Sequence, residues 1–436
     1  MARKMKDSGI EWIGEIPEGW EVRKIKSNFA IYAGATPKSE KPEYWDGGIP
    51  WITPADFKTT DKYASYGRKS LTSLGYDSCG TTLVPAGSII FSKRAPVGSV
   101  VIAKNALCTN QGCLSCIPNE AVNSTYFYYC MSIFTEQFEL VSAGTTFKEI
   151  AASTFASFLL PCPPLSQQNE IVNFLDKEIS HVDSMLFHIR SSIEEYKKLK
   201  QAVITQAVTK GVRGEREMKD SGVEWIGEIP KKWNRCKLNS ICTFINGDRS
   251  KNYPSSEDFQ DIGIPFIGAD SLNGFFVDTY SARHISPAKY ASMGGLKITQ
   301  GDILYTLRGS TIGKNAIANF NDGTIASSLV GIRVKNPFLA SSSFLFYWLN
   351  SLNEFVQRDL CINGSTAPNL SAENVAQFFI YIPDITEQHE IADYLDAKCA
   401  EIDRLIAKKE QLVKELENYK KSLIFEYVTG KKELRR

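Results

Sequence analysis

An internal repeat constrains this chain more than any other feature of its sequence. Residues 5–17 read MKDSGIEWIGEIP and residues 218–230 read MKDSGVEWIGEIP, so twelve of thirteen positions are identical at an offset of 213. Trp20 and Trp233 continue the match. A fixed internal period is typical of repeated structural units. The 436 residues therefore predict two copies of one fold, within the two to four domains expected at roughly 100–200 residues per domain.

The match fades in the middle of each copy and returns towards its end. Gly87–Phe91 corresponds to Gly301–Tyr305, and Arg94 corresponds to Arg308. Further on, residues 165–183 match residues 385–403 at an offset of 220, sharing Gln, Glu, Ile, Leu and Asp at fixed positions. Each copy therefore has near-identical ends and a divergent middle. This pattern favours one scaffold that presents two different surfaces.

Each copy begins with a globular part of about 160 residues. Short apolar runs bounded by turn residues predict strands, namely Gly87–Phe91, Val97–Ala103, Asp302–Leu307 and Gly331–Val334. Ser124–Val141 and Ser342–Leu360 have helical periodicity, with aromatic residues on one face. Packing in a hydrophobic core is the expected role of those aromatic residues.

Each copy ends in a predicted long helix, for which Ser166 and Thr386 are candidate N-caps. Apolar residues follow at alternating spacings of three and four, which predicts a coiled-coil seam. At about 1.5 Å per residue, each helix would span roughly 60 Å. The predicted seam residues are Ile179, Val182, Leu186, Ile189, Ile193 and Tyr196 in the first helix, and Ile402, Leu405, Leu412, Leu416, Tyr419 and Leu423 in the second, where Lys409 interrupts the stripe.

The two apolar stripes are expected to pair with each other, because a single exposed stripe of this length is unstable in water. The first helix leads into the second copy through the short segment 211–217. A parallel pair would need a longer return, so the repeat favours an antiparallel, pseudo-circular arrangement. The predicted fold is α+β: two pseudo-symmetric globular α/β domains joined by an antiparallel coiled coil. The predicted divisions are residues 1–164, 165–217, 218–384 and 385–436.

Composition excludes several classes of protein. There are 50 Lys and Arg residues against 49 Asp and Glu, a net charge of +1, which is unlike a free-standing basic nucleic-acid binder. No apolar run approaches the roughly 18–20 residues of a membrane span, and the charged N-terminal segment does not predict a signal peptide. The ten cysteines form no framework and are expected to be reduced. The chain is therefore expected in the cytoplasm.

Catalytic and metal-binding motifs are incomplete. Residues 309–315 resemble a phosphate-binding loop but are one residue short and end in Asn. Cys108, Cys113 and Cys116 offer one Cys-x-x-Cys pair without a nearby His, so buried thiols are favoured over a zinc site. Residues 336–338 read Asn-Pro-Phe, which is short of the Asn-Pro-Pro-aromatic motif of amino-methyltransferases. We expect no catalytic residue, metal or cofactor in this chain.

Polar loops with basic residues lie at matching places in both copies and are candidates for DNA contact. Arg, Asn and Gln can pair with base edges, while Lys, Ser and Thr suit phosphates. Ordinary surface loops are the alternative interpretation of the same residues. The candidate DNA-binding residues are Lys38, Arg94, Gln111, Thr146, Lys148, Arg249, Arg308, Ser365 and Thr366.

Taken together, these motifs resemble the specificity subunit of type I restriction–modification systems. The resemblance rests on the repeated opening at residues 5–17 and 218–230, the strand followed by Arg94 or Arg308, and the Gly-Ser/Thr-Thr turn. It rests also on the helix start that contains Gln168, Glu170, Ile171, Leu175 and Asp176 and its second copy at residues 388–396. It covers essentially the whole chain.

The resemblance implies a subunit that is not itself catalytic. Each of two target-recognition domains would read half of a bipartite site on double-stranded DNA, and the coiled coil would fix the gap between the halves. Two methyltransferase subunits would dock on this chain, and restriction (translocase) subunits would join them. S-adenosylmethionine, ATP and magnesium would be bound by those partners.

Two alternatives remain open from the sequence. One is a self-contained DNA methyltransferase or nuclease, which purified chain would reveal by binding its own cofactor. The other is a coiled-coil scaffold that binds protein rather than DNA. The scaffold explains the neutral charge but leaves the divergent middles without a reason.

Overall fold

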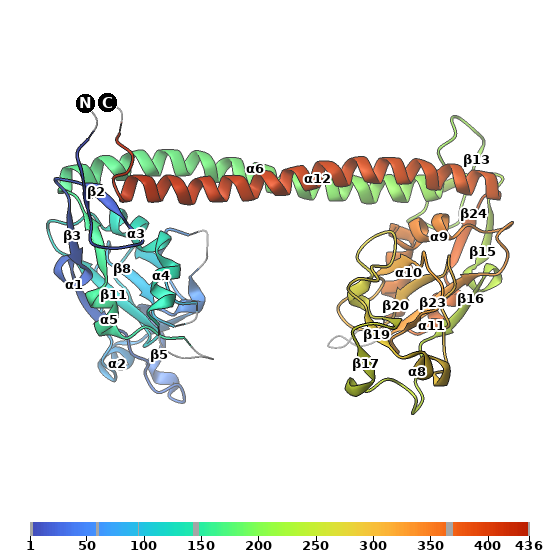
Figure 1. The fold of residues 1–436 in the computed structure, drawn as a ribbon, viewed down its shortest axis with the longest axis horizontal. Helices are drawn as coiled ribbons and strands as arrows, with labels where there is room; N and C mark the ends of the chain where they lie inside the picture. Colours follow the sequence, from blue (N-terminus) through green and yellow to red (C-terminus); the bar gives the residue numbers. More distant parts are fainter. Residues whose placement is uncertain (1–2, 58–60, 95, 143–147, 363–368, 435–436) are drawn as a thin grey trace. The chain divides into compact units, whose positions relative to one another are not determined.

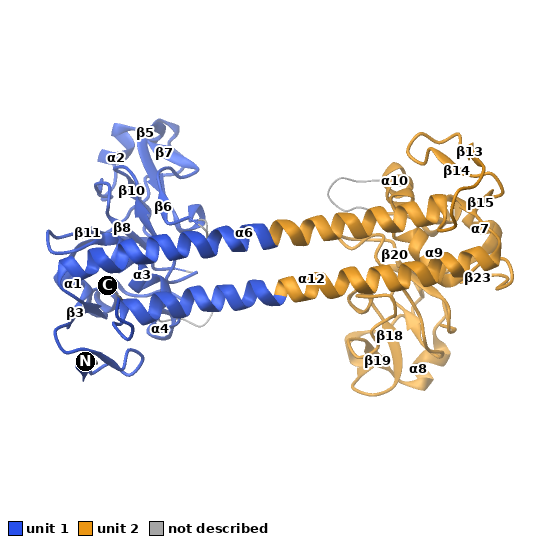
Figure 2. Cartoon of the chain, turned by 90° about the horizontal axis from the view of Figure 1, so that it is seen from above, with its two compact units in different colours: residues 1–189, 411–436 blue, residues 190–410 orange. Residues whose placement is uncertain are grey.

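The computed structural model describes residues 3–57, 61–94, 96–142, 148–362 and 369–434. The chain divides into two compact units, which Figure 2 colours separately: unit 1 holds residues 1–189 and 411–436, and unit 2 holds residues 190–410. Each unit combines one globular domain with a part of both long helices, α6 (Leu165–Lys210) and α12 (Ile385–Val428).

The domain of unit 1 is built on a five-stranded sheet in the order β4-β11-β8-β9-β6, with a three-stranded sheet β10-β5-β7 beside it (Figure 1). Two strand pairs, β1-β2 and β12-β3, complete it. The strands are β1 (Met5–Asp7), β2 (Glu15–Pro17), β3 (Glu21–Lys24), β4 (Phe29–Ala33), β5 (Trp45–Ile52), β6 (Tyr63–Ala64), β7 (Lys69–Leu71), β8 (Ile89–Ser92), β9 (Val100–Ala103), β10 (Cys108–Thr109), β11 (Cys113–Pro118) and β12 (Leu159–Cys162). The helices are α1 (Ile25–Asn28), α2 (Ser73–Asp77), α3 (Ser124–Ile133), α4 (Thr135–Leu140) and α5 (Ala152–Ser157), with 3-10 turns η1 (Pro42–Tyr44) and η2 (Pro54–Asp56).

The domain of unit 2 repeats this plan with two four-stranded sheets, β16-β23-β20-β21 and β17-β19-β18-β22, and the pairs β13-β14 and β15-β24. The strands are β13 (Met218–Asp220), β14 (Glu228–Pro230), β15 (Asn234–Lys237), β16 (Cys242–Asn246), β17 (Phe259–Gln260), β18 (Ile264–Ile267), β19 (Arg283–Ile285), β20 (Ile303–Thr306), β21 (Asn315–Ile317), β22 (Thr324–Ile325), β23 (Leu329–Val334) and β24 (Phe379–Ile382). The helices are α7 (Leu238–Ile241), α8 (Pro287–Ser292), α9 (Ser342–Leu349), α10 (Leu352–Cys361) and α11 (Ala372–Gln377), with 3-10 turns η3 (Ser256–Asp258) and η4 (Ala269–Ser271). The predicted fold class is confirmed.

The strands expected from short apolar runs are present as β8, β9, β20 and β23. The two expected helices are each broken in two. Phe134 leaves helical geometry between α3 and α4, and Asn350 does so after α9. Aromatic residues are buried on α3, α4 and α9, among them Phe127, Phe138 and Trp348, as predicted for core residues. The residues that α10 buries are instead the polar Asn353, Glu354 and Gln357.

The long helices begin one residue before the expected caps. α6 starts at Leu165 and α12 at Ile385, so Ser166 and Thr386 lie inside the first turn. The cap of α12 is Asp384, whose side chain accepts a hydrogen bond of 2.9 Å from the backbone amide of Glu387. The caps assigned to Ser166 and Thr386 were therefore wrong, because helical geometry already begins directly after Pro164 in α6 and directly after Asp384 in α12.

The two long helices pair in opposite directions within each unit (Figure 2). In unit 1, Phe174 packs against Tyr427 with ring centroids 4.5 Å apart, and the Asp183 carboxylate lies 2.6 Å from the Lys420 ammonium. From the first of these contacts to the second, the residue number rises on α6 (174 to 183) and falls on α12 (427 to 420), so the two helices are antiparallel. In unit 2, Lys200 lies 2.6 Å from Asp403 and the Lys409 ammonium 5.6 Å from the Tyr196 ring, in the same sense.

The buried stripe of α12 differs from the seam expected from its sequence. Among the expected residues, Ile402 and Leu423 are buried, whereas Leu412 is 42 % exposed and Tyr419 is 49 % exposed. The inward positions between them include Ile406, Lys409, Val413 and Leu416, each partly buried. The assignment of Leu412 and Tyr419 to the seam was therefore wrong. On α6, Ile179, Val182, Leu186 and Ile193 are buried, while Ile189 and Tyr196 are partly buried, as is Leu405 on α12.

Candidate nucleic-acid interface

Four loop segments far apart in the sequence meet at one place in unit 1. The backbone amide of Lys93 donates to Gly112 (2.9 Å), and that of Ile150 donates to Lys93 (3.0 Å). The Thr36 hydroxyl donates to the side chain of Gln111. Arg94 forms an isolated antiparallel bridge with Glu149. We call residues 34–38, 92–94, 109–112 and 148–150 loop cluster 1.

Unit 2 forms the equivalent arrangement from equivalent residues. The backbone amide of Leu307 donates to Ser328 (2.8 Å), and that of Leu370 donates to Leu307 (3.0 Å). Arg308 bridges to Asn369 as Arg94 bridges to Glu149. We call residues 247–249, 306–309, 326–328 and 369–370 loop cluster 2. Candidates that the sequence placed in separate loops are thus brought together in each copy.

A glycine at the same position allows each cluster to close. A Cβ on Gly34 would lie 2.2 Å from the carbonyl oxygen of Asn110, and one on Gly247 would lie 2.5 Å from that of Ala326. Any side chain there would push the loops apart. The backbone of loop 34–38 therefore lies directly against loop 109–112, and loop 247–249 lies against loop 326–328.

The two clusters differ in charge around the shared arginine. In cluster 1, Glu149 accepts from Lys93 (2.9 Å) and from Arg94 (2.9 Å). These contacts lower the pKa of the Glu149 carboxyl, first through the hydrogen bond from Lys93 and then through the one from Arg94. In cluster 2 the equivalents are the neutral residues Leu307 and Asn369, and Arg308 is exposed with no ion pair recorded among the described residues.

The remaining candidates lie in or beside the clusters. Lys38 is exposed, and its carbonyl accepts from the Trp45 indole at 3.3 Å. Lys148 is exposed, with its ammonium 3.9 Å from Glu139. Gln111 and Arg249 are exposed as well, and Arg249 donates to the carbonyl of Ser327 at 3.4 Å. Thr146, Ser365 and Thr366 lie outside the described residues.

The partners of the matched arginines, Glu149 and Asn369, were missed from the sequence. They correspond to each other at the offset of 220 that governs the end of each copy. The arginines instead follow the earlier offset of 214. The repeat alone could have shown that Glu149 in one copy corresponds to Asn369 in the other. It could not have shown that either residue lies against the matched arginine.

The matched glutamines at the start of the long helices hold each helix to its domain. The buried side chain of Gln168 accepts from the backbone amide of Asn123 (2.8 Å) and donates to the carbonyl of Pro163 (2.9 Å). Gln388 does the same with Ser341 (2.9 Å) and Pro383 (3.0 Å). This repeated feature is therefore structural rather than a DNA contact.

The matched aspartates about two turns further on serve the same junction. Asp176 accepts from the Tyr129 hydroxyl and Asp396 from the Tyr347 hydroxyl. In unit 1 the ammonium of Lys62 also lies 2.6 Å from Asp176. Burial, together with the hydrogen bond to Asp396, raises the pKa of Tyr347, so its hydroxyl remains a donor at neutral pH.

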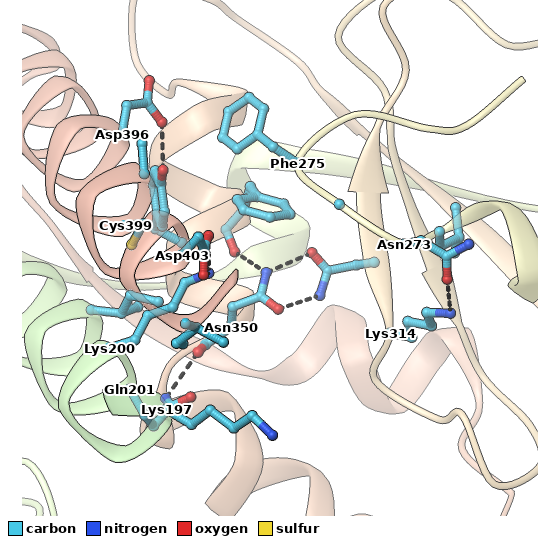
Figure 3. Close-up of a pocket in the computed structure, with 18 of the residues that line it drawn as sticks. Lys197, Lys200, Gln201, Asn273, Phe275, Lys314, Asn350, Asp396, Cys399 and Asp403 are labelled. Atoms are coloured by element: carbon cyan, nitrogen blue, oxygen red, sulfur yellow. Dashed lines mark hydrogen bonds and ion pairs between the residues drawn. The ribbon is translucent and has the colours of Figure 1, made fainter. Parts of the chain in front are cut away.

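A pocket of about 730 Å³ lies in unit 2 between the long helices and the domain (Figure 3). Lys200, Asp396 and Asp403 line it from the helices, and Phe275 and Lys314 line it from the domain. Asn350 and Asn315 pair their side-chain amides at its wall (2.9 Å). The pocket thus has apolar walls with charged groups at its margin.

The described residues hold no group of three or more His, Cys, Asp or Glu side chains suited to a metal ion. Burial raises the pKa of the Cys108 thiol to about 11, and the thiols of Cys113 and Cys116 are shifted in the same direction. Residues 309–314 form the turn between the antiparallel strands β20 and β21. A phosphate-binding loop joins a strand to a helix, so this segment is not one. Within the described parts of the chain, no helix has the length and apolar character to cross a bilayer.

Comparison with known proteins gives one consistent result. A family model described as the type I restriction modification DNA specificity domain matches residues 17–195 and again residues 230–417. The specificity subunit of the type I restriction enzyme MjaIX from Methanocaldococcus jannaschii is 28 % identical over 384 residues, which cover 85 % of this chain and 84 % of that protein. The EcoBI specificity subunit from Escherichia coli is 24 % identical over 364 residues, covering 80 % and 75 %.

Solved structures share the fold at low sequence identity. A chain from work on complex assembly and conformational transition of the type I R-M system gives a TM-score of 0.71 at 16 % identity, covering 95 % of this chain and 98 % of that one. The HsdS subunit from Thermoanaerobacter tengcongensis gives a TM-score of 0.50 at 17 % identity, with the same coverage. These similarities concern the fold.

Proposed function

Because the chain belongs to the type I restriction–modification DNA specificity family, we propose that its two loop clusters read the two halves of a bipartite DNA site. The chain is the DNA-recognition subunit of a type I complex and is not itself an enzyme. Its two specificity domains, one in each matched region, recognise the two parts of that site. DNA, methyltransferase subunits and restriction subunits are the partners that membership of this family implies.

One observation carries the assignment of the clusters: the same framework holds an arginine at the same place in both copies while the surrounding residues differ. Arg94 and Arg308 follow equivalent strands, β8 and β20, and bridge to equivalent residues. An arginine fork can pair with two acceptors on guanine in the major groove. Neighbouring Lys38, Gln111, Lys148 and Arg249 would add base and phosphate contacts. Thr146, Ser365 and Thr366 are proposed for the same role from their place in the sequence.

The test is to remove one arginine at a time from the assembled complex. Arg94→Ala should relax recognition at one position of one half-site, and Arg308→Ala at one position of the other, each by about 5- to 150-fold, the value of a bidentate arginine–base pair. Arg23→Ala is the matched control, since the Arg23 side chain is 40 % exposed, against 48 % for Arg94, and is paired with a glutamate, Glu21 at 2.6 Å, but lies on β3. Mapping methylated adenines genome-wide would show both effects. Loss of both half-sites together in either variant would contradict the two-reader proposal.

We also propose a division of labour with the partners. The antiparallel helices would set the gap between the half-sites, and two methyltransferase subunits would dock on them, because pseudo-symmetry gives the chain two equivalent faces. S-adenosylmethionine, ATP and magnesium would be bound by the partners. The complex would act on DNA in the cytoplasm. Calorimetry on the isolated chain should therefore show no S-adenosylmethionine binding, and micromolar affinity would favour a self-contained enzyme.

A further inference from the structure

The two copies differ at one position between the domain and the long helices. In unit 1 the backbone amide of Ile102, on β9, donates to the carbonyl of Lys62 (2.9 Å). In unit 2 the amide of Ile317, on β21, donates to the carbonyl of Phe275 (2.9 Å). Because β9 and β21 pair in the same way with β8 and β20, Lys62 and Phe275 occupy the same place in the fold.

Lys62 supplies a cation to the helix in unit 1. Its ammonium lies 2.6 Å from Asp176 on α6 and 5.0 Å from the centre of the Tyr129 ring. The lysine side chain is only 20 % exposed, so its stem fills the space between domain and helix. A carboxylate and an aromatic face together form a favourable site for an ammonium group.

Unit 2 keeps the carboxylate and the tyrosine that contact the lysine in unit 1, but it lacks the lysine. Asp396 and Tyr347 stand where Asp176 and Tyr129 stand in unit 1, and the Tyr347 hydroxyl still donates to Asp396. Phe275 packs instead on Phe346 and Tyr347, with centroids 4.7 and 5.8 Å away. Among the described residues no cation is paired with Asp396, and the pocket of Figure 3 opens beside it.

The lysines that line this pocket already have acceptors. Lys200 pairs with Asp403 (2.6 Å), Lys197 pairs with Glu194 (2.8 Å), and Lys314 donates to the side chain of Asn273 (2.7 Å). Asp396 is thus the carboxylate at this pocket that has no opposite charge. The pocket lining also includes apolar side chains, among them Ile204, Phe346 and Phe355.

We propose that this pocket receives a lysine or arginine side chain from a protein partner, with the cationic head on Asp396 and the aliphatic stem against the apolar walls. This occupant has the chemistry that Lys62 brings to the same site in unit 1, and long cationic side chains bury their stems in this way. Asp396, which no cation among the described residues neutralises, disfavours a DNA phosphate at the helix side of the pocket. Asp403 is already paired with Lys200, and Lys314 lies on the domain side, away from Asp396 (Figure 3). The proposal rests on the proposed function, because the partner it names is the methyltransferase subunit of the complex.

The test uses two substitutions in the full chain. Asp396→Asn keeps an acceptor for Tyr347 but removes the charge, and should weaken binding of the cognate methyltransferase subunit about tenfold, the scale of a charge-assisted hydrogen bond. Phe275→Lys supplies the missing ammonium from within the chain, as Lys62 does, and should weaken binding to a similar extent. The double variant should be no weaker than either single variant, because both remove the same contact.

Asp176→Asn in unit 1 is the matched control. Because Asp176 is already paired with Lys62 within the chain, this substitution should leave the affinity for the methyltransferase subunit unchanged. Thermal unfolding and DNA binding are measured for every variant, and Asp396→Asn alone suffices if Phe275→Lys does not fold. Unchanged methyltransferase affinity in Asp396→Asn would overturn the proposal. Stronger DNA binding by Asp396→Asn, with unchanged affinity for the methyltransferase subunit, would also overturn the proposal and indicate that the pocket binds a DNA phosphate. Failure of the complex assembled with the unmodified chain to bind DNA site-specifically would instead contradict the proposed function.

Discussion

At the scale of single residues, the two clusters place one arginine in two electrostatic settings. Arg94 is held by a glutamate that also binds Lys93, whereas Arg308 faces the neutral Asn369. A carboxylate that fixes an arginine lowers the entropy lost on base pairing but cancels charge that would otherwise attract phosphates. The two half-sites should therefore differ in how strongly their recognition depends on salt.

Exchanging the two partners tests this difference. Glu149→Asn should raise non-specific DNA affinity and steepen its salt dependence by about one unit of slope, while relaxing base discrimination at the first half-site. Asn369→Glu should do the reverse at the second. Fluorescence anisotropy over a salt series measures the slopes for each half-site separately. Identical slopes in the unmodified chain and both variants would exclude this electrostatic role.

A second residue predicts a pH dependence of stability. Glu354 on α10 is fully buried, accepts from the Tyr305 hydroxyl, and lies 3.3 Å from Arg358. Burial raises the pKa of Glu354 from 4.5 to about 7. The folded state holds the Glu354 proton more tightly than the unfolded state does. The stability that this protonation contributes is therefore complete below about pH 4.5 and is lost as pH rises through about 7.

Glu354→Gln keeps an uncharged acceptor for Tyr305 and should remove this dependence. The unfolding free energy of the variant relative to the unmodified chain should rise between about pH 5 and 7, by up to about 1.4 kcal/mol per pH unit. Urea unfolding at several pH values measures it, with Glu257→Gln on the exposed surface of the same unit as control. A difference that does not change with pH would show that Glu354 is ionised when folded throughout this range.

Sequence reasoning found Arg94 and Arg308 because they follow a matched strand, but it could not find Glu149 and Asn369. Those partners come from a bridge between segments 55 residues apart in unit 1. The bridge forms where segments 92–94 and 148–150 pair through their backbones, a contact that no local sequence pattern reports. The motif around Gln168 and Asp176 was visible in the sequence only as a repeated helix start, and the structure gives both residues a role in attaching the helix.

At the scale of elements, the second helix shows why a three-and-four spacing does not fix a seam. After Ile402 the sequence offers both Leu405 and Ile406, and a stripe drawn through leucines leads to Leu412 and Tyr419. Applying the repeat offset of 220 to α6 leads instead to Ile406, Lys409, Val413 and Leu416. The lysine conceals this register, because its stem can lie in a seam while its ammonium faces the ring of Tyr196.

Two leucines on the helices of unit 1 test the observed register. Leu186 is 5 % exposed and Leu412 is 42 % exposed. Leu186→Ala should therefore destabilise unit 1 by about 2–4 kcal/mol, whereas Leu412→Ala should cost under about 1 kcal/mol. Chemical unfolding followed by circular dichroism measures both. Equal losses would restore the leucine stripe as the seam.

At the scale of the whole molecule, the repeat alone predicted two domains and an antiparallel helix pair, because seven residues between the copies leave no room for a parallel return. What it could not predict is how the two junctions differ in detail. In unit 1 the indole of Trp20 donates to Gln167 (2.8 Å), and Arg3 does so as well (3.1 Å). In unit 2 the same positions hold Trp233, Arg216 and Glu387. Because Glu387 replaces the neutral glutamine, its contact with Arg216 is an ion pair.

The two junctions are nonetheless equivalent in path, which predicts that the chain can be circularly permuted. After α12, Lys431 and Glu433 line a hollow with Arg3 and Met5, and Leu434 packs on the core of unit 1. After α6, Val212 packs on the core of unit 2 in the same manner.

We expect a chain that is opened between Gly214 and Glu215, with its old ends joined by a short linker, to keep both half-sites and their gap. The new ends fall between Arg213, which binds Glu390 on α12 (2.7 Å), and Arg216, which binds Glu387. Each arginine would hold its own side of the opening to the helix start, and surface segments of this kind tolerate permutation. Methylation mapping and thermal unfolding give the readout, with a control chain opened inside the buried strand β20 that should not fold. A permuted chain that fails to fold, while the same linker added at the old C-terminus is harmless, would show that the connection at residues 211–217 is not interchangeable with the chain ends.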